Sequence, residues 1–206
     1  MRYSWRIDAE TRLIIVRTDD GPEWTPKTEK YAAALAKVDQ QWRALATPIA
    51  ERHGLDVEGV LAQVMQESSG NPRAFRREPN GWTGVGLMQI THPSIKAGHT
   101  DAELFEPARN LEIGTSYTAA LARRYQTEQG LPDWPCVFAA FNAGSCRPNP
   151  KSPWNLFCYG NHVDAEVAFY NTLILARLTE TSDMAQRAAE LQFDLASTLD
   201  LTPHHS

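Results

Sequence analysis

Residues 67–72 read Glu67-Ser68-Ser69-Gly70-Asn71-Pro72, and they end a helical pattern. Before them, apolar residues recur from Val57 to Met65 at the three- and four-residue spacing of one helix face. Gly70 and Pro72 forbid continuation of that helix. The sequence therefore predicts that Glu67 lies in the last turn of a partly buried helix, at the start of a loop.

Two further blocks follow this stretch. They are Gly86-Leu87-Met88-Gln89-Ile90 and, about fifty residues later, Ala140-Phe141-Asn142-Ala143-Gly144-Ser145. In this order the three blocks resemble the soluble lytic transglycosylases, close relatives of goose-type lysozyme. Any one block alone is a weak signal, whereas the three together are specific. The resemblance covers roughly residues 40–180 and implies a lysozyme-like fold and an enzyme that cleaves the glycan strands of peptidoglycan.

Glu67 is the predicted catalytic residue, because the resemblance implies one glutamate that acts as both acid and base. Glycosidic cleavage needs an acid that protonates the leaving oxygen. Burial disfavours a carboxylate and raises its pKa, so a buried Glu67 would keep a proton near neutral pH. A glutamate at a helix end is more often solvent-exposed and inert; the neighbouring blocks favour the catalytic interpretation.

A second carboxylate would decide the mechanism. An inverting hydrolase places one about 6.5–9.5 Å from the acid to activate water. Glu78 is the only acidic residue between Glu67 and Gly86, and no other occurs before Asp101. This scarcity favours the lytic route, in which the N-acetyl group or the 6-hydroxyl of the substrate supplies the nucleophile and the products are 1,6-anhydromuramoyl sugars. Glu78 keeps a hydrolytic muramidase as the alternative.

The resemblance also implies a set of sugar contacts. The first four candidates lie in or near the first two blocks: Ser68, Gly86, Met88 and Gln89. Gly84 and Gly86 would let backbone approach the substrate, and Gln89 offers both a donor and an acceptor to an acetamido group. The alternative for this block is a buried turn, which we expect for Leu87 and Ile90.

The third block departs from the family pattern. Phe141 stands where the family usually has tyrosine, so a ring surface remains but the hydroxyl is lost; Asn142 should contact sugar. The family also carries a tyrosine in an Asn-Tyr-Val segment, and here that segment reads Asn161-His162-Val163. Either His162 or the nearby Tyr159 would take that role. A lone histidine is otherwise more often structural.

Charge and cysteine content exclude several classes of function. The net charge of −5 and the lack of a basic stripe argue against a nucleic-acid partner. Arg73, Arg76 and Arg77 either meet carboxylates of the substrate or merely balance Glu78. The three cysteines are either reduced or form a Cys146–Cys158 bridge that leaves Cys136 free. No Cys-x-x-Cys spacing or zinc-type cluster occurs, so we expect no metal and no cofactor.

The chain has no run of about 20 apolar residues and no apolar leader near Met1. We therefore expect no membrane insertion, synthesis in the cytoplasm, and action on the periplasmic wall after lysis, injection or dedicated secretion. The delivering partner would be a phage or a secretion apparatus. A third interpretation is a weakly active, wall-binding structural component of such an apparatus, favoured by the replacements at Phe141 and His162 and opposed by the intact first two blocks.

The periodicity predicts a mainly α fold, and the resemblance implies that its main part is a lysozyme-like catalytic domain. We expect three parts: an N-terminal β-hairpin in residues 1–24, the catalytic domain in 25–180, and a C-terminal helix and tail in 181–206. Thr25-Pro26 is a helix start signal, Asp56 should cap the helix that carries Glu67, and Pro48 should start or kink a helix. Residues 71–100 should be largely loop. Further helices are expected at 107–126, 133–141, 163–178 and 182–199.

Overall fold

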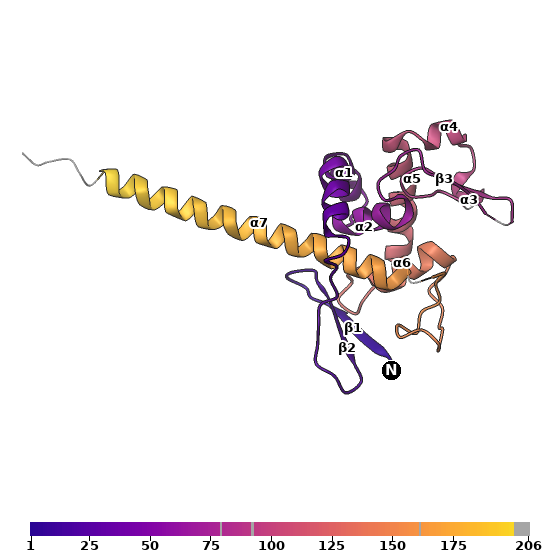
Figure 1. Ribbon diagram of the computed structural model, residues 1–206, viewed down its shortest axis with the longest axis horizontal. Coiled ribbons are helices and arrows are strands. Elements are labelled where there is room, and N and C mark those ends of the chain that lie inside the picture. Colours follow the sequence, from indigo (N-terminus) through magenta and orange to yellow (C-terminus); the bar gives the residue numbers. More distant parts are fainter. Residues whose placement is uncertain (79, 92, 161, 200–206) are drawn as a thin grey trace, which may run out of the picture.

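The computed structural model describes residues 1–78, 80–91, 93–160 and 162–199. These residues form seven helices and four short strands (Figure 1), so the predicted mainly α fold is confirmed. In chain order the elements are β1 (Tyr3–Ile7), β2 (Ile14–Thr18), α1 (Ala32–Arg52), α2 (Val57–Ser68), β3 (Phe75–Arg77), β4 (Thr83–Val85), α3 (Pro93–Lys96), α4 (Asp101–Leu104), α5 (Pro107–Arg124), α6 (Trp134–Ala143) and α7 (His162–Leu199).

Helix α2 lies at the centre of the molecule. It packs between α1 and the first half of α7, and its side chains from Val60 to Val64 are fully buried. Gly59 lets α2 approach α6 closely, because a Cβ at this position would overlap the indole ring of Trp134. The buried face of α2 fixes the position of its C-terminal turn, which carries Glu67.

The N-terminal hairpin forms as predicted and packs on the helical body. Strands β1 and β2 pair antiparallel, with Ile7 opposite Ile14, and both of these side chains are buried. Asn171 of α7 accepts a hydrogen bond from the backbone N–H of Ile14 at 2.8 Å and donates one to its carbonyl at 2.8 Å. The hairpin therefore docks on α7 through both backbone groups of one residue.

The predicted helix start at Thr25-Pro26 is wrong, because α1 begins at Ala32. The carbonyl of Pro26 accepts a hydrogen bond from Asn171, and the N–H of Thr28 donates to the hydroxyl of Thr172. These bonds to α7 hold the segment in an extended path instead of a helical turn.

Pro48 lies inside α1, which continues through it to Arg52. Proline removes one helical hydrogen bond, but Trp42, Ala46 and Ile49 are buried on both sides of it and hold the helix together. Gly54, in a left-handed conformation with φ 69°, follows the end of the helix.

Residues 71–100 are more regular than expected. A second hairpin forms from β3 and β4, with Phe75 opposite Val85 and Arg77 opposite Thr83. The strands have three residues each, and all three side chains of β3 are exposed. Such short strands show no alternation of apolar and polar residues, so the sequence gives no strand signal.

Helix α7 is one continuous element where two helices were predicted. The polar stretch around residue 180 does not interrupt it, and the hydroxyls of Thr179, Thr181 and Ser182 each donate to the carbonyl four residues earlier. The second half of α7 projects away from the other helices (Figure 1). The predicted tail, residues 200–206, lies outside the described residues. Among the described helices, none is both long and apolar enough to cross a membrane.

Candidate active site

Glu67 lies in the last turn of α2, as the sequence predicts. The helix ends immediately after it, because Ser69 and Gly70 both adopt left-handed conformations, with φ of 52° and 78°. The indole N–H of Trp42 donates to the carbonyl of Gly70 at 3.0 Å, which fixes this turn to α1. Asp56 occupies the other end of α2 but makes no capping bond; its carboxylate instead pairs with Arg12 at 3.0 Å.

The environment of Glu67 favours its protonated form. The side chain is half-buried, and burial raises its pKa to about 7. The positive charge of Arg76 lowers this pKa, and the negative charge of Glu78 raises it, but both effects are smaller than that of burial. Glu67 can therefore hold a proton near neutral pH and also release it, as an acid and base must.

Glu78 and Arg76 form an ion pair with an Nε–Oε1 distance of 3.1 Å, on and just after β3. Their charges act in opposite directions on the pKa of Glu67, and the effect of Arg76 is the larger of the two. Glu78 is thus close enough to influence Glu67, but it is already paired. Of the other arginines in this segment, Arg73 lies over the ring of Phe105, 5.5 Å from its centroid.

Glu166, on the second turn of α7, is a second carboxyl group near Glu67 that the sequence analysis missed. Its side chain is 1 % exposed, and neither carboxyl oxygen has a hydrogen-bond partner among the described residues. Burial raises its pKa well above the usual value, and the nearby charge of Glu67 raises it further. Glu166 is therefore a neutral acid. No local sequence motif marks it, because its approach to Glu67 depends on the packing of α7 against α2.

The Gly86–Ile90 block forms a buried turn between β4 and α3. Met88 is fully buried and packs against Gly114 of α5, which leaves it no surface for the predicted sugar contact. Gly86 is also buried; its φ of 77° and its approach to Asn110, rather than to substrate, require glycine. For Gly84, the crowding atoms likewise belong to protein side chains, those of Gln89 and Thr91.

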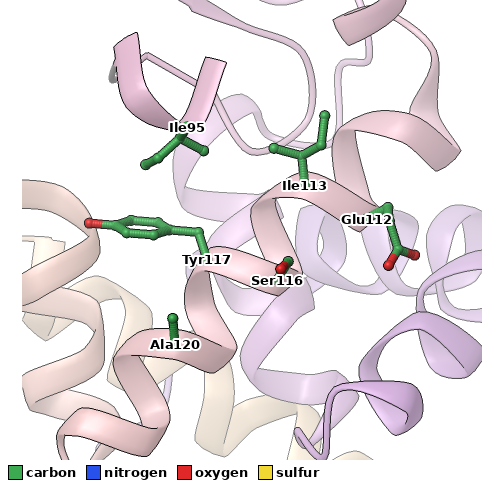
Figure 2. Close-up of a pocket in the computed structure, with 6 residues that line it drawn as sticks. All are labelled: Ile95, Glu112, Ile113, Ser116, Tyr117 and Ala120. Carbon is green, nitrogen blue, oxygen red and sulfur yellow. The ribbon is translucent and has the colours of Figure 1, made fainter. Parts of the chain in front are cut away.

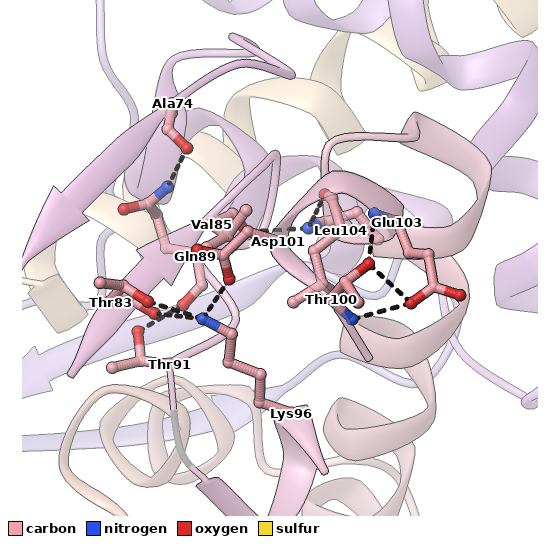
Figure 3. A network of polar contacts seen from close by, with 11 residues as sticks. Ala74, Thr83, Val85, Gln89, Thr91, Lys96, Thr100, Asp101, Glu103 and Leu104 are labelled. Atoms are coloured by element: carbon pink, nitrogen blue, oxygen red, sulfur yellow. Dashed lines mark hydrogen bonds and ion pairs between the residues drawn. The ribbon is translucent and has the colours of Figure 1, made fainter. Parts of the chain in front are cut away.

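The side-chain amide of Gln89 makes its hydrogen bonds within the protein. Its amide nitrogen donates to the carbonyls of Ala74 at 3.2 Å and Gly86 at 3.0 Å (Figure 3). The predicted donation to an acetamido group therefore does not fit this structure. These bonds instead connect the turn to Ala74, the residue before β3.

Figure 3 also shows the contacts that connect β4, α3 and α4. The ammonium of Lys96 donates to the hydroxyl of Thr83 at 2.6 Å and pairs with Asp101 at 2.6 Å. Thr100 and Glu103 close a reciprocal cap at the start of α4. These contacts join β4, α3 and α4 into one unit.

Asn142, at the C-terminal end of α6, bridges two other predicted residues. The backbone N–H of Tyr159 donates to its side-chain oxygen at 2.6 Å, and its amide nitrogen lies 3.0 Å from Nδ1 of His162. Burial lowers the pKa of His162, and the charge of Arg76 lowers it further. The structure thus brings Asn142, Tyr159 and His162 together, and it places the charge of Arg76 within reach of both His162 and Glu67.

The remaining predicted residues have mainly structural contacts. The hydroxyl of Ser68 donates to the carbonyl of Val64 at 3.2 Å. Phe141 is half-buried and packs on Tyr117, with ring centroids 5.5 Å apart. The side chain of Tyr159 is 62 % exposed, so it is the most open aromatic group of the set.

Tyr117 also lines a hollow of about 390 Å³ between α3 and α5. Figure 2 shows Ile95 and Ile113 facing across it, with Glu112 at its edge. A second hollow of about 300 Å³ lies at the second hairpin and includes Trp82. Glu67 lines neither, so neither hollow marks the site by itself. Within the described part of the chain, no three His, Cys, Asp or Glu side chains are placed to hold a metal ion.

The cysteine pairing differs from both predicted states. Cys136 and Cys146 form a disulfide with Cα atoms 5.2 Å apart, and Cys158 is free. Gly144 ends α6 with φ 78°, and the chain turns back there, which brings Cys146 beside the first turn of the helix. The Cys146–Cys158 bridge and the fully reduced state are therefore both wrong.

Comparison with known proteins identifies the matching part of the chain. Residues 45–151, just over half of the chain, match the family model described as the transglycosylase SLT domain. This range contains Glu67 and all three sequence blocks but ends before Tyr159, His162 and Glu166.

Curated proteins with a similar sequence carry related names. The chain is 28 % identical over 134 residues to membrane-bound lytic murein transglycosylase C of Pectobacterium atrosepticum, covering 59 % of this chain and 36 % of that protein. It is 30 % identical over 96 residues to membrane-bound lytic murein transglycosylase E of Buchnera aphidicola, covering 42 % of each chain. It is 37 % identical over 87 residues to membrane-bound lytic murein transglycosylase F of Desulfosudis oleivorans, covering 41 % of this chain and 18 % of the relative. The matches thus span less than half the length of these relatives.

Proposed function

This chain belongs to the transglycosylase SLT domain family, and on that premise we propose that it cleaves the MurNAc-β-1,4-GlcNAc bond of peptidoglycan by the lytic route. Glu67 acts as the one acid and base. The observation that carries the proposal is the pKa of about 7 of this glutamate, at the end of a helix inside the matched segment. The names of the similar proteins, all lytic murein transglycosylases, support the same substrate.

The reaction requires Glu67 in two protonation states. In the first step Glu67 donates its proton to the glycosidic oxygen, the bond to C1 of the muramic acid breaks, and the leaving GlcNAc departs with a free 4-hydroxyl. In the second step the Glu67 carboxylate takes the proton of the 6-hydroxyl, whose oxygen attacks C1 and closes the 1,6-anhydro ring. The proton balance is zero, so no water is consumed and Glu67 returns to its starting form.

The acids around Glu67 favour this route over hydrolysis. Among the described residues, two acidic side chains interact electrostatically with Glu67. Glu78 raises the pKa of Glu67, and Glu67 raises the pKa of Glu166. Glu166 is sealed from solvent and neutral, so it can neither reach water nor take its proton. Glu78 is held by Arg76. The 6-hydroxyl is attached to the reacting sugar and needs no such base to position it.

Hydrolysis through Glu78 is the second candidate function, because Glu78 is ionisable and influences Glu67. Delivery to the wall by lysis, injection or dedicated secretion, through a phage or secretion apparatus, completes the proposal. It rests on the location of the substrate outside the cytoplasm. If the protein fails the activity test, the alternative is a weakly active, wall-binding structural component.

Digestion of purified sacculi, followed by mass spectrometry, tests the proposal. We expect anhydromuramoyl fragments, lighter by one water than muramidase fragments and resistant to borohydride. The Glu67→Gln variant should lose at least about 10²-fold in rate, the contribution of a general acid, while Glu128→Gln, at an exposed loop glutamate, should match wild type. Fragments that borohydride reduces completely would favour hydrolysis and make Glu78→Gln the next variant. Full activity of Glu67→Gln would reject Glu67 as the catalyst.

A further inference from the structure

Asn142 determines the chemical state of His162, and the argument begins with a backbone group. The N–H of Tyr159 can only donate, and it lies 2.6 Å from Oδ1 of Asn142. The amide oxygen of Asn142 must therefore face Tyr159. Its NH2 group then faces His162, with an Nδ2–Nδ1 distance of 3.0 Å.

An amide NH2 donates and cannot accept. Nδ1 of His162 must therefore accept this hydrogen bond and carry no proton. The imidazole proton is then on Nε2, because the partner of one ring nitrogen sets the state of the other. Nε2 has no hydrogen-bond partner among the described residues, and it is absent from their fully buried unpartnered atoms, so it keeps an open N–H.

Several groups keep this ring uncharged. Burial and the charge of Arg76, from β3, both lower its pKa. His162 is the first residue of α7, where the positive end of the helix dipole also disfavours an imidazolium. Among the acids on the same helix, Glu166 is neutral, and the carboxylate of Asp164 accepts the indole N–H of Trp154 at 2.7 Å.

We propose that His162 is a fixed neutral hydrogen-bond donor of the active site, and that its Nε2–H binds an uncharged acceptor oxygen of the glycan. The acceptor is either the acetamido carbonyl or a sugar hydroxyl. This inference rests on the proposed function and adds to it the state and role of His162. A neutral imidazole N–H supplies the kind of donor that a phenol hydroxyl supplies, which accounts for a histidine where the family pattern has tyrosine.

The tautomer can be measured without any activity. In ¹⁵N NMR spectra of the whole protein, the His162 signals are assigned by their loss in His162→Gln. We expect a protonated Nε2 and a bare Nδ1 from pH 6 to 8. In Asn142→Asp the carboxylate should draw a proton to Nδ1, because the carboxylate can only accept. A protonated Nδ1 in wild type would overturn the proposal.

Binding of sugar is tested next, in the inactive Glu67→Gln protein. N-acetylated chitooligosaccharide should shift the Nε2–H resonance, and the de-N-acetylated oligosaccharide serves as the comparison. A shift with the acetylated sugar alone identifies the acetamido carbonyl, and a shift with both identifies a hydroxyl. No shift at saturating concentrations of either sugar would overturn the proposed contact.

Turnover of sacculi separates a donor role from a structural one. His162→Phe should lower kcat about tenfold, the value of one ordinary hydrogen bond, and His162→Tyr and His162→Gln should recover most of it because each restores a donor. His53→Gln is the control for loss of a histidine elsewhere, since His53 pairs with Glu112 at the end of α1. Equal losses in the Phe, Tyr and Gln variants, or none in Phe, would overturn the donor role. If wild type fails to cut sacculi, the proposed function fails, while the NMR result stands.

Discussion

The pKa of Glu67 predicts the pH dependence of activity. Its carboxyl group is protonated below about pH 7 and loses its proton above that value. Because the first step needs the protonated form, we expect the cleavage rate to be highest below pH 7 and to fall about tenfold per pH unit above it. Turbidity loss of a sacculus suspension across pH 5–9 measures this. A rate that keeps rising up to pH 9 would contradict the assignment of Glu67 as the acid.

Two buried glutamates, each 1 % exposed, offer a matched pair for a stability test. Glu58 is paired with Arg43 at 3.0 Å and lies 3.7 Å from Arg177, whereas Glu166 has no hydrogen-bond partner within the described part of the chain. Removing one member of a buried ion pair costs about 3–5 kcal/mol, so Glu58→Gln should destabilise the protein. Glu166→Leu removes an unsatisfied acid and should stabilise it at neutral pH.

The sign of the pH effect at Glu166 follows from its raised pKa. In the unfolded chain this carboxyl group ionises near pH 4.3. Above that pH it loses its proton in the unfolded state but keeps it in the folded state, so rising pH lowers the free energy of unfolding. The stability gain in Glu166→Leu should thus be small at pH 4 and grow as the pH rises toward neutral. Thermal unfolding at both pH values measures it. A variant less stable than wild type at pH 7 would show that Glu166 has a favourable partner.

At the scale of elements, the disulfide between α6 and its following loop gives the next prediction. Alkylation of the unreduced protein should label Cys158 alone, because Cys136 and Cys146 are bonded. A loop of about ten residues is worth about 2–3 kcal/mol when closed by a disulfide, so reduction should lower the midpoint of thermal unfolding. Mass spectrometry identifies the labelled cysteine, and label on Cys136 or Cys146 would refute the pairing.

The elements also show which features the sequence can predict. The first hairpin, α5, α6 and the position of Glu67 follow from local periodicity and terminator residues. The extended path at Thr25-Pro26 depends on side chains far away in sequence, and α7 continues through a polar stretch that apolar periodicity does not bridge. The same distinction holds in the site. Glu67 has a local sequence signature, whereas Glu166 comes near Glu67 only because α7 packs on α2.

Sequence blocks can also mark structure instead of contact. In the Gly86–Ile90 block, Met88 faces the core and Gln89 bonds to backbone carbonyls. These residues stabilise the turn itself. Periodicity in so short a segment cannot tell an inward side chain from one that faces the substrate, because the turn geometry alone decides the direction.

At the scale of the whole molecule, α7 divides into two parts with different surroundings. Its first half carries buried residues from Val163 to Ile174 and binds the N-terminal hairpin through Asn171. Thr181 and Ser182 are exposed, and the second half of the helix projects away from the body (Figure 1). The boundary at residue 181, proposed from the sequence, lies inside this one continuous helix.

A chain that ends at Ser182 tests that division. The core, the Asn142–His162 contact and Glu67 all lie before this point, so we expect the shortened protein to unfold within about 1 kcal/mol of the full chain and to cut sacculi at the same rate. Asn171→Ala in the full chain is the contrasting variant: it leaves both backbone groups of Ile14 unpaired on a buried face, at a cost of about 1–3 kcal/mol for each unsatisfied group. If the shortened chain loses activity on sacculi but still binds chitooligosaccharide, the projecting half of α7 serves the intact wall, and the boundary at residue 181 would not separate function from an appendage.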